Sequence, residues 1–352
     1  MICLLLLLAV VAAMPLVQLA SLGYLLHAAA NLARQRGWSS AFPGLRLAGR
    51  LGAFAGLAAL FWLPVWLVCD LSYAMQLLEP GSPAAAQWRL AALASTGLWL
   101  MYVTWAAMRG GRVRHFIWPA PFRWMSQIWR LSTWRRAGDG LYELLVALQF
   151  PRLWWLGARA AVGALAWTLL PVTLMIIGQR AHDFPAAAVV GLLGAVAMIV
   201  VMLYLPFLQI QMAVRNRLVA MFDVSSVRRL CRHAPWAHAL SLLLLCLLCI
   251  PLYILRIEAT PAELLWAPSL VFVWFMFPAK LLLGAAMGYA AGRQRKMLPV
   301  RHWLLRWPAR GVALASVLLY VGSLYVAQVI AGQGALVMVF QHAFLIPAPL
   351  GG

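Results

Sequence analysis

The chain has 352 residues, of which 65% are hydrophobic and only 10% are charged, and its net charge is +20. In soluble domains about a quarter of the residues are charged. This composition therefore excludes an ordinary soluble protein and requires lipid as the solvent. The excess of basic residues is explained by membrane topology, and a nucleic-acid-binding function is therefore not expected.

Apolar stretches of about the length that crosses a bilayer follow one another along the chain. Lipid cannot satisfy free backbone groups, and the alternation typical of a barrel is absent, so the segments are expected to be helices. The sequence predicts an all-α, polytopic transmembrane bundle forming a single integral membrane domain over residues 1–352. The eight predicted spans are 2–26, 51–76, 85–108, 153–179, 184–213, 236–255, 263–291 and 310–333.

The first span resembles a signal peptide, but it lacks a positive n-region and its apolar run is longer than the usual h-region. We therefore expect an uncleaved span with the N-terminus outside the cell.

Basic residues alternate between the connecting segments. The segments 27–50, 109–152, 214–235 and 292–310 hold 4, 8, 5 and 6 of the 28 basic residues. The positive-inside rule assigns these segments to the cytoplasm. The sequence thus predicts a multi-pass protein of the inner (cytoplasmic) membrane with both termini external.

Two cytoplasmic segments are expected to form amphipathic helices that lie flat in the membrane interface. One covers about 121–136, within an Arg/Trp-rich interfacial segment at 109–152. A second helix is expected to follow "AGDG" in that segment. The other covers about 224–234, where Asp223 or Ser225 can cap the first turn and Pro235 ends the helix.

The arginines of these segments are the candidate lipid-binding residues, because anionic headgroups attract basic residues at the cytoplasmic leaflet. The simpler alternative, which is preferred at this stage, is that positive-inside topology and arginine-rich codon usage produce the same segments. The candidates are Arg123, Arg130, Arg135, Arg136, Arg215, Arg217, Arg228, Arg229 and Arg232.

No catalytic motif is present: the chain has no HExxH, GxSxG, phosphate-binding loop or acid-rich metal motif. The "CLLC" pair at Cys246 and Cys249 lies in a leucine-rich span and is interpreted as two small buried hydrophobes. We therefore expect no enzymatic activity, no metal and no cofactor. The favoured function is a scaffold, assembly or lipid-interacting component. Its expected partners are membrane lipids, with a protein partner or a second copy of the chain as open alternatives.

Polar residues inside spans are costly and usually serve function. Lys280 follows Pro278, which frees a backbone carbonyl, so a transporter or permease with Lys280 near its pathway is the alternative. A long lysine side chain can instead extend to the interface. Asp70 and Arg159 are further candidates near span ends, where packing or interfacial roles are common.

Three segments carry a family resemblance: "GYLLHAAANLARQRGWSSAFPGLRLAGRLG", "YLPFLQIQMAVRNRLVAMFDVSSVRRLCRHAPWA" and "QHAFLIPAPL". They resemble an uncharacterised family of bacterial multi-pass membrane proteins, whose hallmark is a span followed by an arginine-rich elbow with "AxFD"-like residues. Ala220, Phe222 and Asp223 match this pattern, whereas the first elbow has Pro43 where the acid is expected. The resemblance covers most of the chain and implies a fold class and a membrane location, but no activity.

The two elbows also share an early Asn and a Ser-Ser pair. Internal duplication and chance similarity both remain open at this point.

Overall fold

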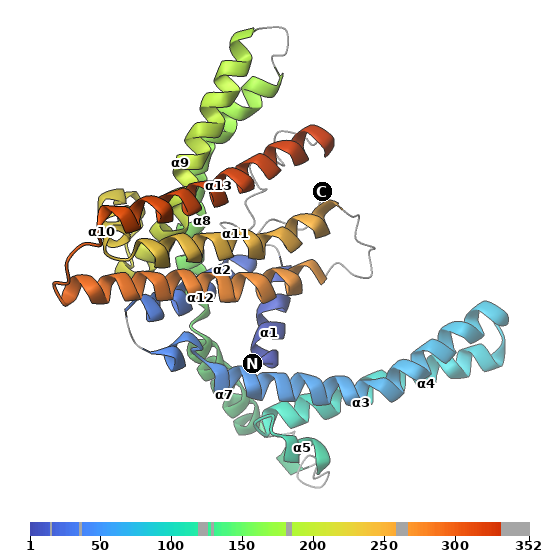
Figure 1. Ribbon diagram of the computed structural model, residues 1–352. Helices are drawn as coiled ribbons and strands as arrows, with labels where there is room; N and C mark the ends of the chain where they lie inside the picture. Colours follow the sequence, from blue (N-terminus) through green and yellow to red (C-terminus); the bar gives the residue numbers. More distant parts are fainter. Residues whose placement is uncertain are drawn as a thin grey trace. The chain divides into compact units, whose positions relative to one another are not determined.

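A computed structural model describes residues 1–14, 16–34, 37–118, 126–127, 130–180, 185–257 and 267–331. Within these ranges the chain is helical and has no strand (Figure 1). Among the described residues, seven helical segments are long and apolar enough to cross a membrane, so the chain is a helical membrane protein. They contain the helices α3 (Leu45–Leu78), α4 (Pro83–Met108), α8 (Phe150–Arg180), α9 (Pro185–Arg215), α11 (Pro235–Ile257), α12 (Ala267–Arg295) and α13 (Trp303–Ala331).

The predicted first span, 2–26, is wrong as one continuous helix. The structure instead has α1 (Ile2–Ala13) and α2 (Gln18–Ala33), separated by a turn in which Leu16 has a φ of 66°. Such a left-handed backbone cannot continue an α-helix. At 16 residues α2 is short for a span, yet almost every residue from Ala20 to Ala33 is buried.

Contacts divide the chain into two compact units, whereas the sequence predicts one membrane domain. The first unit comprises residues 1–7 and 44–149, and the second comprises residues 8–43 and 150–352.

The first unit is built on an antiparallel pair of helices, α3 and α4 (Figure 1). The Ser82 side chain caps α4 by accepting a hydrogen bond from the Ala85 N–H at 3.1 Å. Trp99 of α4 donates to the Ala58 carbonyl at 3.0 Å, and its ring packs edge-on against Trp62. Only 11% of the apolar window of either helix is buried, so most of this surface is available to lipid.

The segment 109–152 contains α5 (Val113–Ile117) and α7 (Leu131–Leu148). The flat helix predicted at 121–136 falls partly on residues 121–125 and 128–129, which lie outside the described residues. From Leu131 onward one helix runs through "AGDG", so the expected helix break there is wrong. α7 ends at Leu148, and the next residue, Gln149, has a φ of 50° that separates α7 from α8.

The core of the second unit is α2, which packs against α8, α9 and α12. Glycines permit these crossings: a Cβ atom on Gly23 would lie 1.8 Å from the Leu153 carbonyl oxygen. On the neighbouring helix, a Cβ on Gly284 or Gly288 would meet the backbone of α2 at 2.3 and 2.5 Å. Small residues that let helix backbones approach are the usual means of packing in membranes, where apolar burial alone gives no driving force.

The two elbows contain similar 3-10 turns, η1 (Trp38–Ala41) and η2 (Leu218–Phe222). Their shared Ser-Ser pairs lie in different elements, however: the first is in η1, whereas Ser225 and Ser226 belong to α10 (Val224–His233). The sequence match therefore does not correspond to equivalent positions in the two turns.

Candidate functional site

The second elbow brings basic residues of the second unit together at one end of its helices. α9 ends at Arg215, and Asn216 adopts a φ of 56°, which turns the chain into η2. Asparagine tolerates this left-handed conformation better than most residues. The short helix α10 then leads directly into α11.

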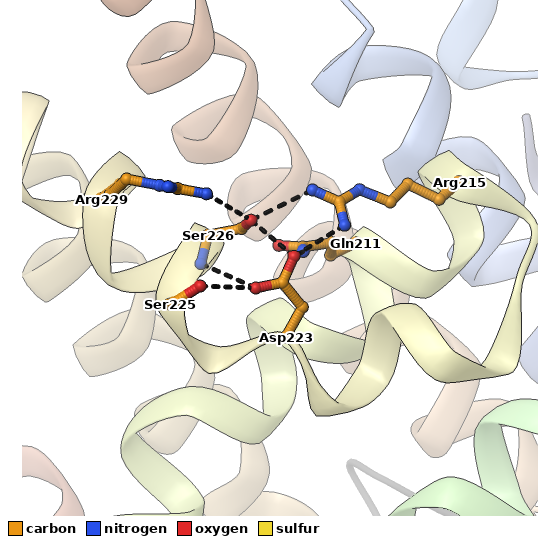
Figure 2. A network of polar contacts seen from close by, with 6 residues as sticks. All are labelled: Gln211, Arg215, Asp223, Ser225, Ser226 and Arg229. Carbon is orange, nitrogen blue, oxygen red and sulfur yellow. Dashed lines mark hydrogen bonds and ion pairs between the residues drawn. The ribbon is translucent and has the colours of Figure 1, made fainter.

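Asp223 organises this elbow (Figure 2). Its Oδ1 accepts hydrogen bonds from the Ser226 N–H at 3.1 Å and the Ser225 hydroxyl at 2.8 Å. Its Oδ2 accepts from the Ser226 hydroxyl at 2.6 Å and forms an ion pair with Arg215 at 2.7 Å. Hydrogen bonds from Ser226, Ser225 and Arg215 hold the pKa of Asp223 well below its usual range. The prediction that Asp223 caps this helix is confirmed.

Ser226 also ties Arg229 into the same network. Its hydroxyl oxygen accepts hydrogen bonds from Arg215 and from Arg229, both at 3.1 Å (Figure 2). In addition, Gln211 of α9 donates to Asp223 at 3.4 Å. The guanidinium groups of Arg215 and Arg229 are thus engaged within the protein.

Two further arginines hold the carboxyl end of α9. Arg34, at the end of α2, donates to the carbonyls of Ala213 and Val214 at 3.2 and 2.5 Å. Arg159 of α8 donates to the backbone carbonyl of Asn216 at 2.9 Å and to its side-chain oxygen at 2.5 Å. The last carbonyls of a helix lack intrahelical partners and carry the negative end of its dipole, so these contacts stabilise the end of α9.

A pocket of about 300 Å³ lies beside this network, between α9, α10, α11 and α13. Four arginines line it, two from α10 and two from α13, and none of the described residues that line it is acidic. The lining residues are Leu203, Tyr204, Arg228, Cys231, Arg232, Pro235, His238, Arg306, Ala309, Arg310, Ala313 and Leu314.

The four arginines form two pairs, each spaced four residues apart along its helix: Arg228 with Arg232, and Arg306 with Arg310. Like charges at this spacing lie on one helix face and repel each other. The Nε of Arg306 is buried and makes no hydrogen bond to any described residue. Arg310 lies 5.7 Å from the Trp307 ring centre, a cation–π distance. The pocket therefore gathers positive charge that no described acid neutralises.

One wall of the pocket is neutral. The sulfur of Cys231 lies 3.0 Å from Nδ1 of His238, and the His238 ring stacks on Phe207. Burial raises the pKa of Cys231 to about 12, so this thiol stays protonated at neutral pH and adds no negative charge.

The other end of the pocket is apolar. Along α13 the lining changes from Arg306 and Arg310 to Ala313 and Leu314. Eight residues of helix correspond to roughly 12 Å. Leu203 and Tyr204 of α9 also belong to the lining. The pocket thus combines a cationic end with an apolar extension.

The structure separates the arginines proposed from sequence. Arg228 and Arg232 line the pocket, Arg215 and Arg229 bind the Asp223 network, and Arg217 is exposed at the start of η2. Arg229 does not line the pocket, and its guanidinium donates to Ser226.

The remaining candidate arginines belong to the first unit. Arg130, Arg135 and Arg136 are exposed at or within α7, where Arg136 donates to the Ser132 carbonyl at 3.2 Å. Arg123 lies outside the described residues. None of the three described arginines lines the pocket.

Arg306 and Arg310 are ligand candidates that sequence reasoning missed. In the sequence they belong only to the basic segment 292–310, which the positive-inside rule is expected to assign to the cytoplasm. Their spacing of four residues at the start of the last span is the available signal, but nothing local indicates which helix faces them.

The intramembrane candidates occupy different environments. Lys280 is only 1% exposed, and its Nζ donates to Oε1 of the fully buried Gln209 at 2.8 Å, so the interpretation that it extends to the interface is wrong. Asp70 is exposed on α3. Arg159 binds Asn216, as described above.

Comparison with protein-family models, with curated proteins and with solved structures finds no match to this chain.

Proposed function

We propose that this protein is a non-enzymatic, multi-pass component of the bacterial inner membrane that binds anionic lipid through its phosphate. The observation that carries the proposal is the pocket lined by Arg228, Arg232, Arg306 and Arg310, with no acid among its described lining residues. Arginine presents a planar set of donors that matches phosphate and makes charge-assisted, bidentate hydrogen bonds. The apolar end of the same pocket fits the adjoining hydrocarbon.

We also infer how α10 is oriented in the membrane. α10 lies flat in the cytoplasmic interface, with Val227 buried against the protein and Arg228 and Arg232 at headgroup depth. The four basic segments are cytoplasmic and both termini are external. With seven long helical segments, this alternation requires α1 and α2 to cross together as one broken span.

Membership of the uncharacterised family with arginine-rich elbows is part of the same proposal. The "AxFD"-like residues have a structural role that supports it, since Ala220 is buried and Asp223 caps α10.

The test measures which lipids remain with the protein. The chain is reconstituted in nanodiscs of mixed phosphatidylglycerol and phosphatidylcholine, released in mild detergent, and analysed by native mass spectrometry. We expect retained phosphatidylglycerol in the parent and a loss of this enrichment in R228Q/R232Q.

The matched control is R295Q/R301Q, which removes the same charge from two exposed residues that do not line the pocket. Equal enrichment in the parent and in R228Q/R232Q contradicts the proposal.

A second function, transport, is favoured by one observation: the Lys280–Gln209 pair is buried inside the helices of the second unit. Buried charges in membrane helices commonly mark substrate or proton pathways. In a cysteine-free background, Gln209→Cys should react with a membrane-impermeant maleimide if a pathway reaches this pair. Protection from the reagent on both sides of the membrane contradicts transport at this point.

A further inference from the structure

We propose that the four-arginine pocket selects lipids whose headgroup ends in a phosphomonoester over lipids with a phosphodiester. This inference rests on the proposed lipid-binding function and names the class of ligand.

The charge of the pocket favours a phosphomonoester. The pocket contains two arginine pairs, Arg228 with Arg232 and Arg306 with Arg310, and the part of the chain that the structure describes contributes no acid to it. A phosphodiester brings a single negative charge. A phosphomonoester carries about −1.5 to −2 near neutral pH, and surrounding guanidinium groups favour its fully ionised form. The dianion therefore neutralises more of the repulsion within each pair.

The number of hydrogen-bond donors favours the same ligand. A phosphomonoester presents three terminal oxygens as strong acceptors, whereas a diester presents two. The arginines come from two different helices, so both helices can supply guanidinium groups to a ligand in the pocket. Four guanidinium groups carry many more N–H donors than two phosphate oxygens can accept, so a third oxygen adds hydrogen bonds.

The shape of the pocket distinguishes a lipid from a free phosphate. Its cationic end continues into a wall of Ala313, Leu314 and Leu203. A small soluble phosphate leaves this apolar wall exposed to water, whereas the hydrocarbon next to a lipid headgroup covers it. Phosphate recognition and chain burial therefore occur in one site.

The alternative role for the same arginines, that they only mark the cytoplasmic face, requires no particular geometry. It predicts that any preference for the more highly charged lipid does not depend on which basic residues are removed, because positive-inside topology responds to charge rather than to its place in a pocket. Selectivity that depends on the pocket arginines is thus the decisive property.

The experiment uses the full chain in phosphatidylcholine nanodiscs that contain equal mole fractions of phosphatidic acid and phosphatidylglycerol with identical acyl chains. Native mass spectrometry measures the retained lipid at constant salt. One extra charge-assisted hydrogen bond corresponds to about tenfold in affinity, so we expect about tenfold more phosphatidic acid than phosphatidylglycerol. The preference should shrink at about pH 5, where the monoester loses its second charge.

R306Q/R310Q should remove the preference, and R295Q/R301Q should keep it. Arg310→Lys retains the charge but loses the planar donors, so it should lower the preference even though the local charge is unchanged. Arg310→Lys keeps the test valid if R306Q/R310Q does not fold.

Different outcomes overturn headgroup selectivity and lipid binding. Equal retention of both anionic lipids above phosphatidylcholine overturns the phosphomonoester selectivity and leaves anionic-lipid binding intact. Retention of neither above phosphatidylcholine overturns both. Displacement of phosphatidic acid by an equal concentration of soluble glycerol 3-phosphate overturns the role assigned to the apolar wall.

Discussion

The Asp223 network and the four-arginine pocket are neighbouring regions that use the same residue type in opposite ways. In the network, Arg215 and Arg229 bind Asp223 or Ser226, and Arg34 and Arg159 hold the end of α9. In the pocket, no arginine side chain donates a hydrogen bond to a described residue; these side chains are Arg228, Arg232, Arg306 and Arg310.

The difference teaches that positive charge beside a membrane does not by itself identify a ligand site. A guanidinium group that already binds a carboxylate or a helix-end carbonyl stabilises the fold, and breaking it leaves a polar group without its partner. A guanidinium group without a protein partner has its donors available. The two regions should therefore respond differently to the same substitution.

The largest expected effect comes from the helix crossing that supports the network. Gly23→Ala places a methyl group against the Leu153 carbonyl, which forces α2 and α8 apart. Since Arg34 follows α2 and Arg159 belongs to α8, the end of α9 loses both contacts. We expect unfolding in detergent to become easier by about 1–3 kcal/mol, measured by thermal or SDS titration.

Gly311→Ala is the control for that substitution. Gly311 is an exposed helical glycine, and a methyl group added to it would have open space around it. The substitution should be neutral or slightly stabilising, since alanine favours helix. Equal effects of the two alanines contradict the tight crossing.

Arg159→Gln tests the network itself. It removes two charge-assisted hydrogen bonds to Asn216, and because Arg159 is half-buried we expect a loss of about 1 kcal/mol in unfolding free energy. Lipid selectivity should not change. Arg310→Gln should show the reverse: weaker binding of anionic lipid with an unchanged unfolding temperature. If both variants change the same property, the distinction between the regions is wrong.

Two adjacent residues give the sharpest comparison. Arg228→Gln and Arg229→Gln remove the same charge from neighbouring positions of α10, but only Arg228 lines the pocket. One basic residue near an anionic surface contributes about 1 kcal/mol, or about fivefold. We expect Arg228→Gln to weaken retention of anionic lipid by about this factor, and Arg229→Gln to leave it nearly unchanged in the nanodisc measurement.

The smallest effect is expected with acid. The pKa of Asp223 is depressed in the folded protein, so its contribution to stability is present above the unfolded pKa of about 3.9 and is lost as the pH falls through the lower folded pKa. The parent should therefore lose stability below about pH 4 more steeply than Asp223→Asn, which retains a capping side chain. Parallel curves of unfolding temperature between about pH 5 and about pH 3 contradict this role.

The sequence by itself determined the membrane class, the approximate positions of the long helices and the cap of α10. Each depends on short-range information. Hydropathy over about twenty residues decides whether a segment prefers lipid, and Asp223 lies three residues from the amide that it caps.

Local sequence signals gave wrong predictions where the backbone conformation or a contact with a distant residue determines the structure. "AGDG" looks like a helix break, but α7 continues through it. The apolar run 2–26 looks continuous, yet the chain turns at Leu16 so that α2 packs among α8, α9 and α12. The burial of Lys280 depends on Gln209, 71 residues earlier in the chain.

The division of the arginines was decided only by the tertiary structure. Arg228 and Arg229 are adjacent and identical in the sequence, but α10 directs one into the pocket and the other toward Ser226. Arg306 and Arg310 join the pocket only because α13 packs against α9 and α11. Which charges remain available to a ligand depends on the distances between side chains of different helices, and those distances are set by helix packing rather than by the order of residues.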